Sequence, residues 1–233
     1  MKVKKWLVPL GLCLILSLLL AGCGNENEGN ESANLPGEDS TLNVIGGDSN
    51  TNEEVPADDA GEEQLSTEEQ VMQAAGEVLP ILADQQIDQL VEWVHPEKGI
   101  RFSPYAYVNV EDHQQFSPEE LMQAWESKEK RVWGSFDGSG EPIELTVEAY
   151  MKTFVYDAPF LEADDVGYNH RIGQGNTVNN AFEAYPNANL VEYHIAGMDA
   201  SLEGMDWRSL RLAFEKHEGS WYLVGIIHDQ WTI

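Results

Sequence analysis

The chain has 233 residues, of which 41 are Asp or Glu and only 13 are Lys or Arg, so its formal net charge at pH 7 is -28. Such an excess of negative charge repels nucleic acid and anionic lipid head groups, and argues against both as partners. Cationic ligands, metal ions and basic proteins remain open, while the charge also supplies solubility in an ion-rich compartment.

Residues 1–22 are typical of an export signal. Lys2, Lys4 and Lys5 form a positive start, and an apolar run from Trp6 to Leu20 follows it. This run of about fifteen residues is too short for a comfortable membrane span, which needs about 20. We therefore expect residues 1–22 to be removed on export.

The sequence Leu20–Cys23, at the end of this run, resembles the lipobox of bacterial lipoproteins. The resemblance implies cleavage before Cys23 and lipid attachment to its thiol, which would anchor the protein on the extracytoplasmic face of the cell membrane. An ordinary secretory signal or a short anchor helix is the alternative. The other cysteine, Cys13, would leave with the signal, so no thiol would remain for a disulfide, a metal site or a nucleophile.

Residues 24–64 contain no Lys or Arg and almost no large apolar side chains. Such a composition cannot bury enough apolar surface to offset the entropy of ordering, so we expect residues 23–64 to be the lipidated cysteine followed by a disordered acidic tether. Residues 65–233 should then form a single domain. That domain carries ten basic and 29 acidic residues, a net charge of -19.

Helices are predicted at the start of this domain. The capping box Ser66–Glu69 begins the first helix, and Pro80 is expected to bend or end it. Apolar residues at helical spacing predict a second helix over 87–94, which stops before Pro96. Another capping box, with a proline at the first helical position, predicts a third helix over 118–128.

The pattern then changes to alternating apolar residues and turns, with one further short helix over 146–155. The strand at 221–231 is apolar on both faces, so we expect it in the centre of a sheet that helices cover on one side. A hairpin loop at His217–Ser220 joins it to the preceding strand. The expected strands span residues 100–107, 131–136, 190–196, 207–216 and 221–231.

Helices followed by a curved, mostly antiparallel sheet with a long final hairpin make an α+β fold. This order, with Val94–Pro96 leading into Gly99–Ser103, resembles the cone-shaped fold of the nuclear-transport-factor-like and cystatin-like families. The amino-acid sequence of Asp206–Leu212 and Leu223–Ile233 is similar to that of uncharacterised bacterial lipoproteins. The resemblance implies no activity, since such folds host enzymes, ligand carriers and interaction modules.

His228 and Asp229 are adjacent but are not predicted to act together. Neighbouring side chains on a strand point to opposite faces of the sheet. We expect His228 to share a face with Val224 and Ile226, and Asp229 to share the other face with Ile227. The pair therefore does not form a catalytic dyad.

No metal site or cofactor is expected from the remaining motifs. The segment Asp137–Glu141 partly matches a calcium loop, but Pro142 stands where the sharp turn needs glycine, so a hairpin turn is favoured. Gly173–Gly175 lacks the third glycine of a dinucleotide loop. The other histidines, which show no ligand spacing, are His95, His113, His170, His194 and His217.

These observations favour a non-catalytic module of the cell envelope that binds a ligand or another protein. Most of the tryptophans and tyrosines should lie in the core, and a few could line a pocket. The residues expected to provide its polar contacts are Arg101, Arg208, Tyr105 and Tyr193. The membrane, through the lipid on Cys23, is the one partner that the sequence indicates.

The alternative is an envelope hydrolase or isomerase that uses a cone-shaped pocket. In that hypothesis His228 or His194 acts as the base, and Arg101 or Arg208 holds an anionic group of the substrate. The two hypotheses differ in whether these side chains converge on one open cavity.

Overall fold

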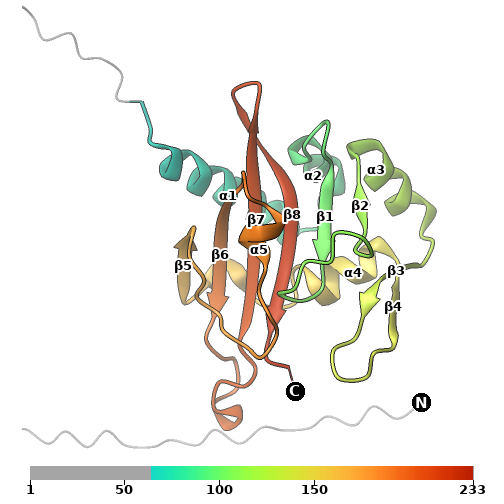
Figure 1. Ribbon diagram of the computed structural model, residues 1–233, viewed down its shortest axis with the longest axis vertical. Coiled ribbons are helices and arrows are strands. Elements are labelled where there is room, and N and C mark those ends of the chain that lie inside the picture. Colours follow the sequence, from blue (N-terminus) through green and yellow to red (C-terminus); the bar gives the residue numbers. More distant parts are fainter. Residues whose placement is uncertain (1–63, 233) are drawn as a thin grey trace, which may run out of the picture. The chain divides into compact units, whose positions relative to one another are not determined.

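A computed structural model describes residues 64–232 of the chain (Figure 1). The predicted export signal, the lipidated Cys23 and the acidic tether lie outside the described residues. Among residues 64–232, the helices are all too short or too polar to cross a membrane.

The order of helices and strands is α+β, as expected. The α-helices are α1 (Thr67–Ala83), α2 (Ile87–Trp93), α3 (Pro118–Ser127), α4 (Val147–Phe154) and α5 (Ala181–Ala184). The strands are β1 (Ile100–Ser103), β2 (Gln115–Phe116), β3 (Arg131–Ser135), β4 (Pro142–Leu145), β5 (Asp165–Tyr168), β6 (Asn189–Ile195), β7 (Arg208–His217) and β8 (Ser220–Gln230). Two short 3₁₀ helices span Phe160–Glu162 and Ala200–Leu202.

Six strands form one sheet in the order β2-β1-β8-β7-β6-β5, while β3 and β4 form a separate hairpin (Figure 1). Neighbouring strands of the sheet are antiparallel except β1 and β8, which are parallel. Strand β8 lies between β1 and β7, which confirms that it is central. The mostly antiparallel sheet with a long final hairpin is therefore the predicted one.

The helices begin where the capping boxes predict. Ser66 Oγ accepts a hydrogen bond from the Glu69 amide at 3.2 Å, and a Glu69 carboxylate oxygen accepts one from the Ser66 amide at 2.8 Å. Pro80 does not end the first helix, which continues through it to Ala83. Ile81 and Leu82 beyond the proline are buried, and their packing offsets the one hydrogen bond that proline cannot donate.

Helices α1 to α4 share one hydrophobic core with one face of the sheet. At its centre the rings of Trp133 and Tyr150 stack with centroids 3.9 Å apart, and Phe102 meets both rings edge-on. Trp133 also donates a hydrogen bond from Nε1 to the Leu145 carbonyl at 2.8 Å. These contacts attach the β3–β4 hairpin and α4 to strand β1.

The opposite face of the sheet is covered by α5 and the irregular segment before it. A smaller apolar cluster there contains Tyr185, Val224 and Ile227. The pairing of β7 with β8 shifts at this point, because Val224 is an extra residue between the pairs Phe214–Leu223 and Ala213–Gly225. The prediction that Val224 shares a face with His228 is therefore wrong: this β-bulge turns Val224 to the other face.

Candidate functional site

A cavity of about 570 Å³ opens between the segment that follows β1 and the β3–β4 hairpin. We call it the acidic cavity. Its lining residues are Tyr105, Tyr107, Asn109, Asp112, His113, Gln114, Val132, Gly134, Ser135, Phe136, Asp137 and Thr177. They come from three parts of the chain that are far apart in sequence, and tertiary packing alone brings them together.

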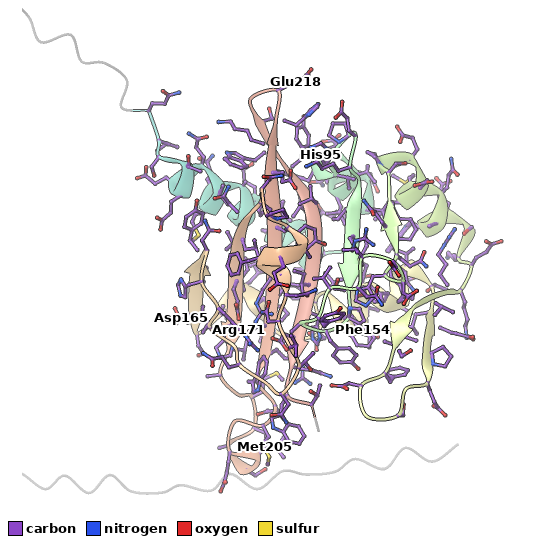
Figure 2. All side chains as sticks on the ribbon, viewed as in Figure 1. His95, Phe154, Asp165, Arg171, Met205 and Glu218 are labelled. Atoms are coloured by element: carbon purple, nitrogen blue, oxygen red, sulfur yellow. The ribbon has the colours of Figure 1, made fainter. Side chains whose placement is uncertain are left out.

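Aromatic rings form the apolar part of the acidic cavity. Tyr107 is 49% exposed and Phe136 is 40% exposed, so both rings are available to a ligand. Phe136 and Tyr105 each pack on Phe154 from α4, with centroid distances of 6.2 and 5.8 Å; Figure 2 labels Phe154. This support from the core holds the Phe136 and Tyr105 rings in place, while part of the Phe136 surface stays open.

Two carboxylates supply the charge of the acidic cavity. Asp137 accepts hydrogen bonds from the Gly138 amide at 3.0 Å and from the Thr177 hydroxyl at 3.3 Å. Asp112 accepts one from the side-chain amide of Asn109 at 2.7 Å. Within residues 64–232 neither carboxylate forms an ion pair, and the lining contains no Lys or Arg.

His113 contributes a neutral ring to the lining. Its Nδ1 accepts a hydrogen bond from the Asn109 amide at 3.2 Å and lies 3.0 Å from the Ser103 hydroxyl. Nδ1 is therefore an acceptor, and the proton sits on Nε2, next to Gly134. Burial, helped by the nearby Arg101 charge and opposed by Asp112, lowers the pKa of His113 to about 4. At neutral pH this ring offers a hydrogen-bond donor but no positive charge.

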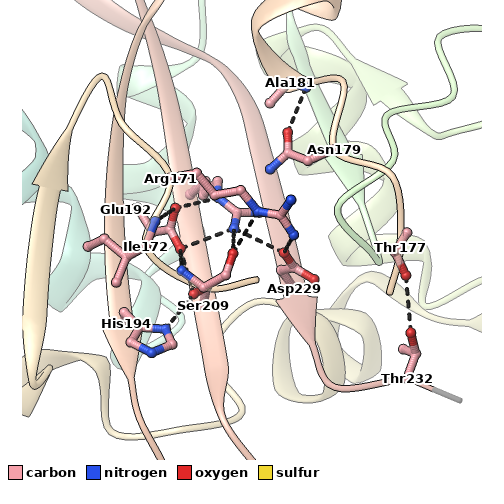
Figure 3. A network of polar contacts seen from close by, with 12 residues as sticks. Arg171, Ile172, Thr177, Asn179, Ala181, Glu192, His194, Ser209, Asp229 and Thr232 are labelled. Carbon is pink, nitrogen blue, oxygen red and sulfur yellow. Dashed lines mark hydrogen bonds and ion pairs between the residues drawn. The ribbon is translucent and has the colours of Figure 1, made fainter. Parts of the chain in front are cut away.

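A second polar cluster lies at the centre of β6, β7 and β8, on the sheet face opposite helices α1 to α4 (Figure 3). The Arg211 guanidinium donates to Glu192 at 2.6 Å and to Asp229 at 2.9 Å. All three side chains are no more than 2% exposed. Cross-strand alternation places them side by side, because Glu192 pairs with Arg211 in the register of β6 and β7.

A strap at residues 171–177 closes over this cluster. The Gly173 amide donates to Glu192 at 2.8 Å, and the Gly173 carbonyl accepts from Arg211 at 3.2 Å. A Cβ at Gly173 would stand only 2.3 Å from Ser209 Oγ, so glycine is needed for this approach. The strap thus leaves the cluster sealed from solvent.

The two carboxylates of the cluster differ in their pKa. Burial acts to raise the pKa of Glu192, but the Arg211 charge and the hydrogen bonds from Arg211, Ser209 and Gly173 outweigh it, so the pKa is lowered. For Asp229 burial wins over Arg211 and Arg171, and the pKa is raised. The difference follows from hydrogen bonding, because Asp229 Oδ1 is buried without a partner among the described residues.

Two of the residues predicted for a catalytic site, His228 and Arg208, do meet, on the helical face of the sheet. Asp157 joins them: its Oδ2 lies 3.1 Å from His228 Nε2 and 2.8 Å from Arg208 Nε. His228 is fully buried, and its Nδ1 lies 3.1 Å from the Pro104 carbonyl. Burial opposes ionisation of Asp157, yet the two basic partners lower its pKa. Both ring nitrogens of His228 are thus occupied by protein acceptors.

The other two predicted residues lie apart. His194 is on the opposite face from His228, where Nδ1 lies 2.8 Å from Ser209 Oγ and the ring lies beside Trp207. Arg101 donates to the His113 carbonyl at 2.9 Å and also bonds the side chain of Gln115. Arg101 therefore supports the acidic cavity from behind and does not line it.

Of the two tyrosines predicted to provide polar contacts, Tyr105 lines the acidic cavity and Tyr193 does not. Tyr193 is buried in the helical core, where burial raises its pKa to about 12. The segment Asp137–Gly140 forms the turn of the β3–β4 hairpin, as predicted. In residues 64–232 no three His, Cys, Asp or Glu side chains converge in a way that would hold a metal ion.

His113 and Asp137 stand out separately in the sequence, but the site that they form with Asp112, Tyr107 and Phe136 was not predicted. The available signal was the pairing of a carboxylate with aromatic residues in each of two turn-rich segments. That signal does not say that the two segments touch.

No family model matches the chain, and no curated protein matches it. Among solved structures, the chain is similar to an NTF2-like protein from Cytophaga hutchinsonii, with 9% identity, 71% of this chain and 99% of that chain covered, and a TM-score of 0.35. It is also similar to an NTF2-like protein of unknown function from Shewanella baltica, with 12% identity, 62% and 91% coverage, and a TM-score of 0.20.

Proposed function

We propose that this protein is an extracytoplasmic lipoprotein whose folded domain binds a small organic molecule in the acidic cavity, without catalysis of its own. The observation that carries the proposal is an open cavity of about 570 Å³ in which rigid aromatic rings stand beside polar side chains. Ligand sites typically combine apolar walls of this kind with a few polar groups that orient the ligand.

The rings give the acidic cavity a preformed binding surface. Phe154 supports both Phe136 and Tyr105, so little side-chain freedom has to be lost when a ligand stacks on them. Asn109, Gln114 and Ser135 add neutral donors and acceptors around the rings.

The placement of the histidines favours binding over catalysis. A general base must reach the proton it abstracts and have a pKa near the working pH. His113 lines the acidic cavity, but its pKa of about 4 makes it a weak base. His228 is fully buried, with Pro104 and Asp157 beside its two ring nitrogens.

The anchoring part of the proposal rests on the lipobox-like Leu20–Cys23 and on the acidic segment that follows it. Two or more acyl chains on Cys23 would hold the protein firmly to a membrane, because each buried methylene contributes about 0.8 kcal/mol. Metabolic labelling with an alkyne fatty acid tests this directly. We expect the wild-type chain to incorporate label and Cys23→Ala to incorporate none. A wild-type chain that stays unlabelled in a lipoprotein-producing bacterium would contradict the anchoring.

Ligand binding is tested by screening a library of small polar and aromatic fragments against the full chain in a non-ionic detergent, with ligand-observed NMR as the readout. We expect hits that weaken at least tenfold in Phe136→Ala. The matched control is Leu161→Ala, which also removes an exposed apolar side chain but lies outside the acidic cavity. Hits that respond equally to both variants, or an absence of hits, would overturn the proposed function.

A further inference from the structure

We propose that the ligand of the acidic cavity carries a positive charge, as a protonated amine or a quaternary ammonium group next to an apolar body. This inference rests on the proposed function and specifies the chemical class of the ligand. It is carried by the charges, hydrogen bonds and rings that line the cavity.

The lining has negative charge that the described residues do not compensate. Asp112 and Asp137 are its two charged side chains, and neither forms an ion pair within residues 64–232. Each carboxylate has about four lone-pair positions. The hydrogen bonds from Gly138 and Thr177 occupy two of these positions on Asp137, and the hydrogen bond from Asn109 occupies one position on Asp112. Acceptor positions therefore remain for the N–H groups of an ammonium.

The basic groups close to the cavity do not neutralise it. His113 is neutral at pH 7, because its pKa is about 4 and its Nδ1 serves as an acceptor. Arg101 lies behind the wall, where its guanidinium bonds the His113 carbonyl and Gln115. The rest of the domain reinforces the negative potential, because residues 65–233 carry a net charge of -19.

The aromatic rings suit the same group. A cation within about 6 Å of a ring centroid is attracted to the negative face of the ring, and quaternary ammonium ligands are recognised in this way. Tyr107 and Phe136 are each more than one third exposed and stand in the same lining as Asp137. A ligand can then place its charge near the carboxylates and its apolar body on the rings.

A neutral polyhydroxylated ligand would use the rings and the carboxylates but would gain nothing from the uncompensated charge. An anionic ligand would be repelled by it. The comparison that separates these classes is therefore between ligands of the same shape and different charge.

The probes are 2-phenylethylamine, 2-phenylethanol and phenylacetate, titrated into the full chain in a non-ionic detergent at low ionic strength and pH 7. We expect the amine to bind at least tenfold more tightly than the alcohol, and phenylacetate to bind least. Added salt should narrow the gap between amine and alcohol, because the Debye length falls from about 30 Å at 0.01 M to about 10 Å at 0.1 M.

Asp137→Asn should bring the affinity for the amine close to that for the alcohol, while leaving the affinity for the alcohol unchanged. The control is Asp165→Asn, which changes the net charge equally on strand β5, outside the lining (Figure 2). The preference for the amine should survive in it. Asp112→Asn is the second test variant if Asp137→Asn unfolds at a lower temperature than the wild type.

The outcomes separate this inference from the proposed function. Equal binding of amine and alcohol, or tighter binding of phenylacetate, overturns the positive charge while the binding function stands. Failure of all three probes also overturns it if the fragment library still finds ligands that depend on Phe136. An acidic cavity that binds nothing from either set overturns both proposals.

Discussion

Asp157 and His228 lie 71 residues apart in the sequence and are joined by a hydrogen bond of 3.1 Å between Asp157 Oδ2 and His228 Nε2. Because His228 Nδ1 faces the Pro104 carbonyl, the ring links β8 to both the segment after α4 and the segment after β1. The second of these segments forms one wall of the acidic cavity. The histidine that looks most catalytic in the sequence therefore joins three segments of the fold.

Replacing Asp157 should destabilise the fold. Asp157→Ala leaves His228 and Arg208 without their shared acceptor in a largely buried setting. Hydrogen bonds to charged groups contribute about 1.5–3 kcal/mol each to stability. Arg208 keeps its bonds to the carbonyls of Asp206 and Trp207, so we expect less than the loss of two full bonds, a fall of about 2–4 kcal/mol in the free energy of unfolding. Urea denaturation measures the change, with Asp84→Ala, an exposed helix-end residue, as the control. A loss no larger than the control's would show that the network contributes little.

The two carboxylates that share Arg211 should respond differently to neutralisation. Glu192 accepts bonds from the Ile172 and Gly173 amides as well as from Ser209 and Arg211, and its pKa is lowered. Its ionised form is therefore stabilised by folding, and Glu192→Gln should cost about 2–3 kcal/mol.

Asp229 has a raised pKa, so the folded state resists its ionisation. At pH 7 its charge therefore costs stability, a cost that disappears as the pH falls through its folded pKa. Asp229→Asn removes this charge. It should therefore lower the free energy of unfolding by at least about 1 kcal/mol less than Glu192→Gln does. Chemical denaturation at pH 7 compares the two variants. The reverse order of stabilities would contradict the assignment of the pKa shifts.

Substitution by alanine should have opposite effects on stability at Gly173 and at Gly76. An alanine Cβ at Gly173 would stand 2.3 Å from Ser209 Oγ and 2.8 Å from Trp207, so the strap must shift. Overpacking of this kind typically costs about 1–3 kcal/mol. Gly76 lies within α1 with nothing within 4 Å of the added Cβ, and Gly76→Ala should stabilise by about 0.5–1 kcal/mol. Thermal unfolding should therefore lower Tm in the first variant and raise it in the second.

His113 should make stability depend on pH between about 4 and 6.5. Its folded pKa is about 4, below the value of 6.5 in an unfolded chain, so between these values the unfolded state binds more protons. Stability should then fall as the pH is lowered from 6.5 to 4. Because the ring is only partly buried, we expect this residue to lower the free energy of unfolding by about 1–3 kcal/mol over this pH range.

His113→Gln should remove this part of the pH dependence, since Gln cannot take up the proton. Urea denaturation at pH 7 and pH 5 measures it in both proteins, and His170→Gln, an exposed histidine on a loop, is the control. An NMR titration midpoint for His113 near 6.5 would contradict the neutral ring in the acidic cavity.

The helices of this fold were predictable because their signals are local. The capping box at Ser66–Glu69 and the one at Ser117 involve residues three positions apart, and the structure has both. Pro80 is the exception, because the buried Ile81 and Leu82 beyond it outweigh a local preference. Strand β8 was also predictable, since a strand that is apolar on both faces has to be central.

Strands β2 and β5 were missed because each is short and lies at an edge of the sheet. Their extended form depends on one distant partner strand: Gln115 pairs with Arg101, and Tyr168 with Val191. The bulge at Val224 was missed for a similar reason, because an extra residue in a strand can be recognised only when the partner strand and its register are known.

The acidic cavity depends entirely on contacts between segments that are distant in the sequence. Asp112, Asp137 and Thr177 belong to segments that share no motif, yet they line one cavity. Packing of Trp133 on Phe102 of β1 and on Tyr150 of α4 is what attaches the β3–β4 hairpin to the rest of the domain. The sequence by itself determined the α+β order, the helix starts and the strongly acidic character, which follow from composition and short-range spacing. Only the tertiary structure decided which carboxylates and rings line one cavity, because long-range packing and strand register bring them together.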